Sequence, residues 1–173
     1  MELAGADDYM IGSMRMLTLP ECTLLCVRSE PTPFAELGAV FVPLIKATFV
    51  AQETARLYVP GPLIVRYYLA DPDQQHDGLY TMEVGFQAPA GTPAQEPVRM
   101  AQEPARILMV PSLRGAALLL WGSLAHMLEA YDALERAVAA TGLEPTGEYR
   151  EMHYWFEGDD SPRNLFGLYM GVR

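Results

Sequence analysis

The segment that decides how the rest of the chain is interpreted is Gly147-Glu148-Tyr149-Arg150-Glu151-Met152-His153-Tyr154-Trp155-Phe156. Aromatic residues crowd it, and Gly147 and the Gly158-Asp159-Asp160 cluster mark its ends, a pattern that predicts a strand. Alternation along a strand sends Glu151, His153 and Trp155 to one face and Met152, Tyr154 and Phe156 to the other. A carboxylate beside an imidazole and an indole is costly to bury without compensation. We therefore expect either an ion pair or a ligand pocket at Glu151.

This segment has a counterpart earlier in the chain. Residues 61–73 align with 147–159 without a gap, at an offset of 86 residues, and Leu19-Pro20 matches Val110-Pro111. The alignment indicates two halves, 14–87 and 105–172, which follow an extension at 1–13. Glu151 aligns with Val65, so the carboxylate belongs to one half only. A feature that breaks an internal symmetry is a better candidate for function than one that obeys it.

Each half has the pattern strand–helix–strand–strand. Strands are expected at about 14–28, broken at Pro20, and at 63–70, 80–87, 106–121, 148–156 and 165–172. Thr32-Pro33 and Gly122-Ser123 begin the two helices, with a kink at Pro43 in the first, and Gly142 ends the second. Such halves bury their apolar faces only by combining. The predicted fold class is α+β, with tandem pseudo-symmetric repeats sharing an antiparallel sheet, helices on one face and a ligand cleft on the other.

Composition limits the classes of function. A chain of 173 residues suits a single domain. The formal charge of −10, with 12 scattered Lys and Arg residues, argues against direct nucleic-acid binding. We see no apolar segment of 18 residues that would cross a membrane and no secretory signal, and we expect a cytoplasmic protein.

Cysteine and histidine spacing predicts no disulfide, no metal site and no cofactor. Cys22 and Cys26 stand four residues apart in a predicted strand, which separates them by roughly 13 Å, too far for a disulfide. The three histidines, His76, His126 and His153, lie in different segments without metal-ligand spacing.

Four stretches carry a resemblance to a known family. They are Pro60-Gly61-Pro62 before Arg66-Tyr67-Tyr68, residues 82–86 (Met-Glu-Val-Gly-Phe), Trp121-Gly122 before residues 130–134 (Ala-Tyr-Asp-Ala-Leu), and residues 142–147 with Arg150-Glu151. Their order resembles the GyrI-like small-molecule-binding domain, or bacterial effector-binding domain, of the SOUL/GyrI superfamily, over about 14–172. In that family the Glu of the Arg-Glu pair lies at the floor of an aromatic-walled pocket for cationic, lipophilic drugs. The sequence departs from the family at Trp121, where a His is usual, and at Phe166-Gly167, where a Thr-Glu pair is common.

The resemblance and the strand pattern together give a candidate site. The expected ligand-binding residues are Glu151, Trp121, Trp155, Tyr67, Tyr68, His153, Tyr154 and Tyr169. The alternative for Glu151 is a structural ion pair with Arg66, Arg150 or Arg173. For Glu83 we expect a carboxylate that faces solvent.

We expect a stand-alone protein that binds lipophilic, cationic or planar small molecules, similar to the sensing half of a multidrug-responsive transcription regulator. The main alternative is a hydrolase that opens the strained cyclopropane of DNA-alkylating natural products, with Glu151 and Tyr68 as acid and base. A hydrolase should place a tyrosine hydroxyl or a His153 nitrogen within one water of Glu151, whereas a binder should surround it with aromatic faces and aliphatic groups. A gyrase-inhibitor-like interaction protein and a haem protein rank lower, and a protein partner or a homodimer stays open.

Overall fold

The computed structural model describes residues 9–56, 61–71, 78–89, 91–92, 95–98 and 105–173. Several expectations fall outside these ranges: most of the N-terminal extension, the turn at Pro60 and the polar loop that contains His76. All other expected elements can be compared with the structure.

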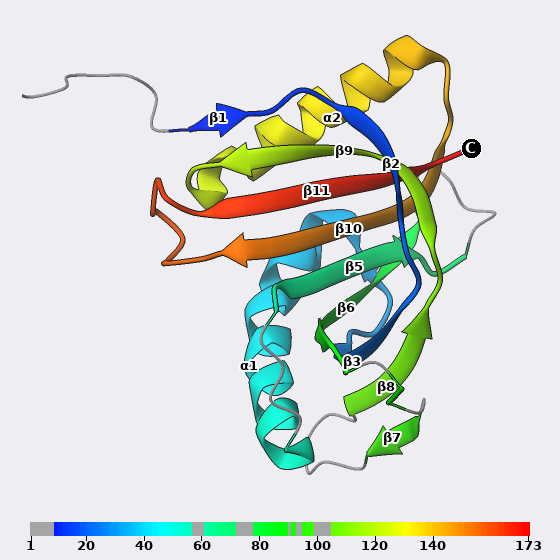
Figure 1. Ribbon diagram of the computed structural model, residues 1–173, viewed down its shortest axis with the longest axis vertical. Helices are drawn as coiled ribbons and strands as arrows, with labels where there is room; N and C mark the ends of the chain where they lie inside the picture. The colour runs from blue at the N-terminus through cyan, green and yellow to red at the C-terminus, as the bar shows by residue number, and fades with distance from the viewer. Residues whose placement is uncertain (1–8, 57–60, 72–77, 90, 93–94, 99–104) are drawn as a thin grey trace, which may run out of the picture.

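The described strands form one sheet in the order β1-β9-β11-β10-β5-β6-β3-β8-β7, with β2 paired to β9 and β4 to β6 (Figure 1). All strand pairs are antiparallel. The strands are β1 (Met10–Ile11), β2 (Arg15–Leu19), β3 (Cys22–Arg28), β4 (Thr32–Pro33), β5 (Leu63–Leu69), β6 (Leu79–Gln87), β7 (Gln95–Val98), β8 (Ala105–Val110), β9 (Leu113–Trp121), β10 (Pro145–Trp155) and β11 (Leu165–Val172).

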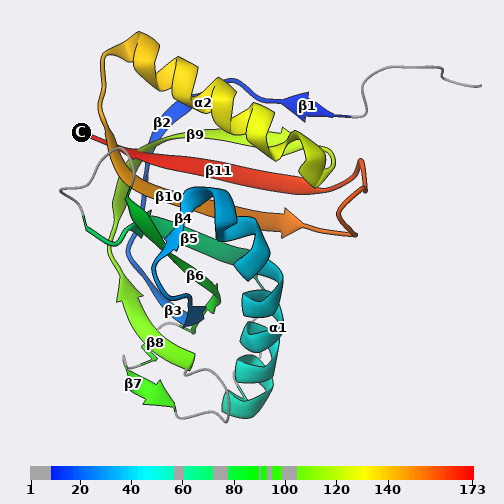
Figure 2. The same cartoon turned by 180° about the vertical axis from the view of Figure 1, so that it is seen from behind.

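Two helices cover one face of this sheet. The first is α1 (Leu37–Ala55), preceded by the short η1 (Phe34–Glu36), and the second is α2 (Met127–Thr141), preceded by η2 (Leu124–His126). Both lie on the same side, α1 over β3 and β6 and α2 over β9 and β11 (Figure 2). Gly142 ends α2 in the left-handed conformation, at φ 74°, as expected of a C-terminal glycine. The α+β fold class is therefore confirmed.

Prolines break the first strand of each half at the expected places. Pro20 separates β2 from β3, and Pro111 separates β8 from β9. The pairing is reciprocal, because β2 pairs with β9 while β3 pairs with β8. These long, bent strands curl the sheet along one side, as Figure 1 shows at its right-hand edge.

The strand order is mirrored about the middle of the sheet, where β5 of the first half pairs with β10 of the second. Within this pair Glu151 lies opposite Val65, its own counterpart at the offset of 86. A residue faces its counterpart only across an approximate two-fold axis, so Glu151 lies beside that axis. The next strands, β6 and β11, do not keep the offset of 86. Arg66 pairs with Glu83 of β6, and its counterpart Met152 pairs with Gly167 of β11, so these two partners are 84 residues apart. The superposition of 14–87 on 105–172 stays a prediction.

The first helix differs from expectation in how it begins and in how apolar it is. Thr32 does not cap it, because its hydroxyl donates to the Glu30 carbonyl oxygen at 2.8 Å, and Pro43 lies inside the helix. Residues 34–54 have a mean hydropathy of 1.7 over a length that would cross a membrane. The sequence-based prediction that the chain has no apolar segment of 18 residues is therefore wrong. One such helix is weak evidence for a membrane span, since a core helix has the same composition. Leu44, Thr48 and Ala51 are buried, and 22% of the apolar window as a whole is buried.

Candidate functional site

Glu151 lies on the face of β10 that the helices cover, with 9% of its surface exposed. Its Oε1 accepts a hydrogen bond from the Tyr131 hydroxyl of α2 at 2.9 Å and a longer one from Tyr67 of β5 at 3.4 Å. Its Oε2 lies 3.1 Å from Nε2 of His153. The cleft was expected on the face away from the helices, and for Glu151 that placement is wrong, because Tyr131 reaches it from α2.

Aromatic rings surround this group of four side chains. Tyr149 stacks on Tyr67 with 5.2 Å between ring centroids, and Phe34 packs against Tyr67 at 6.2 Å. The His153 ring packs edge-on against Phe166 at 4.9 Å and lies 5.8 Å from Phe41 of α1. Strands β5, β10 and β11 and both helices therefore supply the aromatic surround of one carboxylate.

The Tyr67 and Tyr131 hydroxyl groups that donate to Glu151 stay protonated. Burial, and then the negative charge of Glu151, raise the pKa of Tyr67 and of Tyr131 well above the ordinary value. Burial also raises the pKa of Tyr149 to about 12. The phenols can therefore donate to the carboxylate at any physiological pH.

No lysine or arginine pairs with Glu151 in the part of the chain that the structure describes. The three arginines proposed as ion-pair partners bind other carboxylates: Arg66 binds Glu83 and Glu148, Arg150 binds Glu148, and Arg173 binds Glu144. Alternation along the strands explains this, because Arg66 and Arg150 point to the opposite face of the sheet. The expected alternative, an ion pair of Glu151 with Arg66, Arg150 or Arg173, is wrong; the ionisable neighbour of Glu151 is instead His153, at 3.1 Å.

On that opposite face, three arginines and two glutamates form a connected set, which we call the arginine–glutamate network. Glu83 is fully buried and binds Arg28 and Arg66, while Glu148 accepts from Arg66 at 2.8 Å and from Arg150 at 2.8 Å. Burial opposes ionisation of Glu148, but the hydrogen bonds of the two arginines outweigh it and lower its pKa. The expectation that Glu83 faces solvent is wrong, because guanidinium groups occupy the positions around it.

The remaining predicted site residues do not contact Glu151. Tyr68 belongs to the opposite face, where its hydroxyl donates to Glu83 at 3.3 Å. Tyr154 and Tyr169 share a hydrogen bond of 2.6 Å between their hydroxyls, again on that face beside Met152. Burial raises the pKa of Tyr169. A role for these tyrosines in ligand binding stays a prediction, and it would concern a surface other than that of Glu151.

Trp121 and Trp155 are both exposed. Leu165 of β11 lies between them in the sheet, because it pairs with Trp121 of β9 and with Trp155 of β10. The strand register shifts between His153 and Trp155, which indicates a bulge. After the bulge, Phe156 rather than Trp155 packs beside His153, with 6.3 Å between the ring centroids. The simple alternation that placed Trp155 beside Glu151 does not hold beyond His153.

Tyr131 contacts Glu151 in the candidate site, a contact that the sequence pattern did not predict. Its place in the apolar stripe of the second helix assigned it to the core, where it is indeed buried. The available signal was chemical: Tyr131 is a phenol on a helix face that packs against the strand carrying Glu151, and a buried hydroxyl needs a partner.

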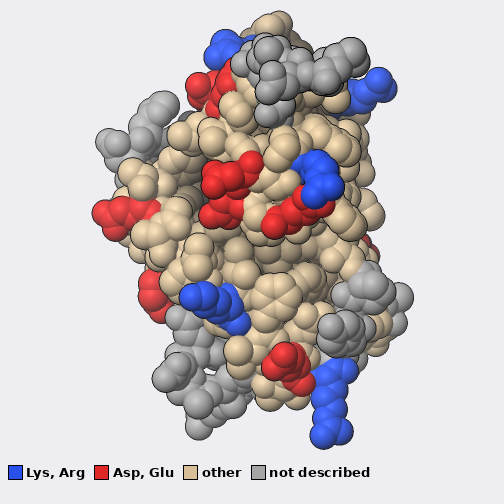
Figure 3. Space-filling model, turned by 90° about the vertical axis from the view of Figure 1, so that its left-hand side faces the viewer, with Lys and Arg blue, Asp and Glu red and all other residues tan. Residues whose placement is uncertain are grey.

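Charge is scattered on the surface that Figure 3 shows, where acidic and basic side chains stand singly or in small groups among uncharged ones. No single-sign field covers this side. Within the described ranges, no group of three or more His, Cys, Asp or Glu side chains is arranged to hold a metal ion.

Comparison with known proteins gives the fold a name. No family model and no curated protein matches the sequence. Among solved structures, the EcmrR C-terminal domain aligns with a TM-score of 0.61 at 14% identity, covering 95% of this chain and 99% of that one. A structure of SAV2435 bound to tetraphenylphosphonium aligns with a TM-score of 0.64 at 8% identity, covering 93% and 94%. An integron cassette protein of Vibrio cholerae aligns with a TM-score of 0.61 at 11% identity, covering 96% and 100%.

The chain covers only 57% of EcmrR in its complex with DNA, so the likeness concerns one part of that protein. Identities this low establish the fold and nothing finer. At that level, the resemblance drawn from the four sequence stretches is confirmed: this chain has the GyrI-like effector-binding fold.

Proposed function

We propose that this protein binds small lipophilic molecules, cationic or planar, against Glu151 and does so without covalent chemistry. One observation carries the proposal: within the described residues, a buried carboxylate at the centre of the sheet has no lysine or arginine partner. A buried charge persists only when it is hydrogen-bonded and, better, paired with an opposite charge. His153, whose Nε2 lies 3.1 Å from Oε2, offers a positive charge only when it is protonated, and a cationic ligand would supply a permanent one.

The neighbouring side chains suit such a ligand. Tyr67 and Tyr131 satisfy Oε1 by hydrogen bonds, which fixes the position of the carboxylate before the ligand arrives. Rings such as Tyr149 and Phe34 offer π faces, and each cation–π contact adds about 0.5–2 kcal/mol. The solved structure of SAV2435, which shares the fold, contains tetraphenylphosphonium, a lipophilic cation of the proposed class.

Calorimetric titration with tetraphenylphosphonium tests the proposal. Glu151→Gln keeps the size and hydrogen-bonding capacity of the side chain but removes its charge. An interaction with a charged group is worth about 1.5–3 kcal/mol, so we expect this variant to weaken binding by about 10- to 100-fold.

The matched control is Glu144→Gln, which removes an exposed carboxylate that pairs with Arg173 just outside the ends of β10 and β11. Its affinity should equal that of the wild type. The proposal fails if tetraphenylphosphonium does not bind, or if both variants bind it equally well while remaining folded.

The hydrolase remains the second candidate because of the donors around Glu151. We expected a tyrosine hydroxyl or a His153 nitrogen near Glu151 in an enzyme, and both kinds are in direct contact with it. The tyrosine would be Tyr131 or Tyr67 rather than Tyr68, which binds Glu83. The expectation that a binder would surround Glu151 with aromatic faces and aliphatic groups alone is wrong, because two hydroxyls and an imidazole contact the carboxylate. The same hydroxyls also satisfy a buried carboxylate, so they fit a binder as well as an enzyme.

A further inference from the structure

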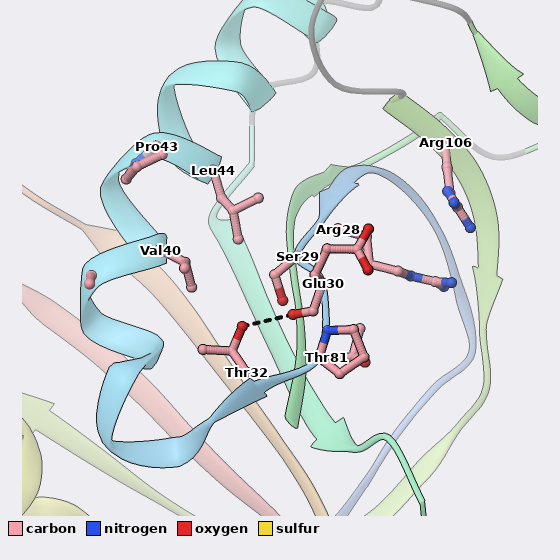
Figure 4. A pocket seen from close by; sticks show the side chains of 11 residues that line it. Arg28, Ser29, Glu30, Thr32, Val40, Pro43, Leu44, Thr81 and Arg106 are labelled. Atoms are coloured by element: carbon pink, nitrogen blue, oxygen red, sulfur yellow. Dashed lines mark hydrogen bonds between the residues drawn. The ribbon is translucent and has the colours of Figure 1, made fainter. Parts of the chain in front are cut away.

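A cavity whose lining does not include Glu151 lies beside α1. It has a volume of about 720 Å³, within the range of sites that hold drug-sized molecules. Its walls come from α1, from the loop that follows β3, and from β6 and β8 (Figure 4). The side of α1 that carries Phe41 packs towards His153, whereas Val40 and Pro43 line this cavity. The cavity and the surroundings of His153 therefore use different residues of α1.

The cavity has one apolar and one polar side. Its apolar wall consists of Ala39, Val40, Pro43 and Leu44 of α1. Across from this wall, Arg28, Arg106 and the hydroxyl residues Ser29, Thr32 and Thr81 line the cavity, and Figure 4 shows both guanidinium groups on the side away from α1. A molecule with an apolar body and a polar head matches this arrangement.

The charge of the polar side favours an anionic head. The arginine–glutamate network, to which Arg28 belongs, contains three guanidinium groups and two carboxylates and so carries one net positive charge. Arg106 adds a second positive charge, and the exposed Glu30 at the cavity removes one. One positive charge is left, in a protein whose formal charge is −10.

Arg106 is the group that an anion would satisfy. Its Nε is buried and has no hydrogen-bond partner, and no ion pair joins its guanidinium to any described residue. Arg28, by contrast, is already bound to Glu83 through Nε at 2.8 Å. A carboxylate matches a planar guanidinium through two parallel hydrogen bonds; from the cavity it would approach the terminal nitrogens of Arg106, because Nε itself has no accessible surface.

We propose that this cavity is a separate site for an amphipathic monoanion, whose carboxylate binds Arg106 and whose apolar body lies against α1. The proposal does not depend on ligand binding at Glu151. It predicts a protein able to hold a lipophilic cation at Glu151 and an amphipathic anion at Arg106 at the same time.

Titration with octanoate, monitored by calorimetry, tests this site. Octanol and octyltrimethylammonium serve as neutral and cationic probes with the same chain length. Arg106→Gln should weaken octanoate binding by about 10- to 100-fold, because it removes a charge-assisted contact. Ala39→Trp, at an exposed helix position on the apolar wall, should also abolish it by filling the cavity.

Two controls keep the outcome specific. Arg136→Gln removes an exposed arginine of α2, and Glu151→Gln removes the other site, so neither should change octanoate affinity. Denaturation curves establish that each variant is folded. The proposal is overturned if octanoate shows no saturable binding, if octanol binds equally well, or if folded Arg106→Gln and Ala39→Trp variants bind octanoate like the wild type.

Discussion

Replacing Tyr131 by Phe tests whether its hydroxyl holds Glu151 in place. The Tyr131 hydroxyl approaches Oε1 to 2.9 Å, whereas the Tyr67 hydroxyl is at 3.4 Å, near the limit of a hydrogen bond. Tyr131→Phe therefore removes the stronger donor from a buried carboxylate, which should cost about 1.5–3 kcal/mol of unfolding free energy. Tyr67→Phe should cost less, about 0.5–1.5 kcal/mol.

The measurement is urea denaturation of each variant in two backgrounds, wild type and Glu151→Gln. With Gln as a neutral acceptor, Tyr131→Phe should cost only about 0.5–1.5 kcal/mol. The difference between backgrounds isolates the interaction of the hydroxyl with the charge and excludes the loss of packing. An equal cost in both backgrounds, or a larger cost for Tyr67→Phe, would refute the reasoning.

The same variant has a consequence for binding. Tyr131 positions the carboxylate but does not itself supply the negative charge. We therefore expect Tyr131→Phe to weaken tetraphenylphosphonium binding less than Glu151→Gln does. If Tyr131→Phe is the more damaging of the two, the hydroxyl rather than the carboxylate is the principal contact.

Three further predictions concern chemistry and stability. Incubated with a cyclopropane-bearing alkylator, the protein should protect the intact compound stoichiometrically; formation of a ring-opened water adduct that stops in Glu151→Gln would establish the hydrolase instead. Glu83→Gln should cost about 1.5–3 kcal/mol in urea denaturation, because it removes the charged acceptor that the partly buried Arg28 and Arg66 share, whereas Glu144→Gln should cost no more than about 1 kcal/mol. The pKa of Glu148 lies below its ordinary value of 4.5, so its ion pairs stabilise the fold above that pH, and this stabilisation is lost as the pH falls through the lower folded value. Acid titration of unfolding should accordingly show a shallower loss of stability in Glu148→Gln than in the wild type.

The sequence predicted the elements well wherever local chemistry is decisive. Strand β11 has the expected bounds, Leu165–Val172, and Gly142 and the two prolines at 20 and 111 act where expected. These residues restrict the backbone directly, so their effect does not depend on the rest of the fold.

The errors share a different cause. Which face of a sheet is covered, and by what, depends on how distant elements pack, and a single strand does not encode it. Glu83 was expected in solvent because the sequence did not reveal that Arg28 and Arg66 meet there. Trp155 was placed beside Glu151 because a bulge is invisible to a rule of strict alternation.

The two faces of the central strands treat charge in opposite ways, and this contrast is the strongest argument for a function at Glu151. On the helix-free face, Arg66 and Arg150 flank Glu148, and the arginine–glutamate network compensates each carboxylate internally. Glu151 directly follows Arg150 in β10 but lies on the face that the helices cover, where hydroxyl groups and an imidazole contact it instead. The same strand pair therefore carries arginines, but alternation along the strands directs them away from Glu151. A carboxylate kept apart from nearby arginines, beside the approximate two-fold axis of the fold, is the feature on which we base the proposal that a ligand supplies its counter-charge.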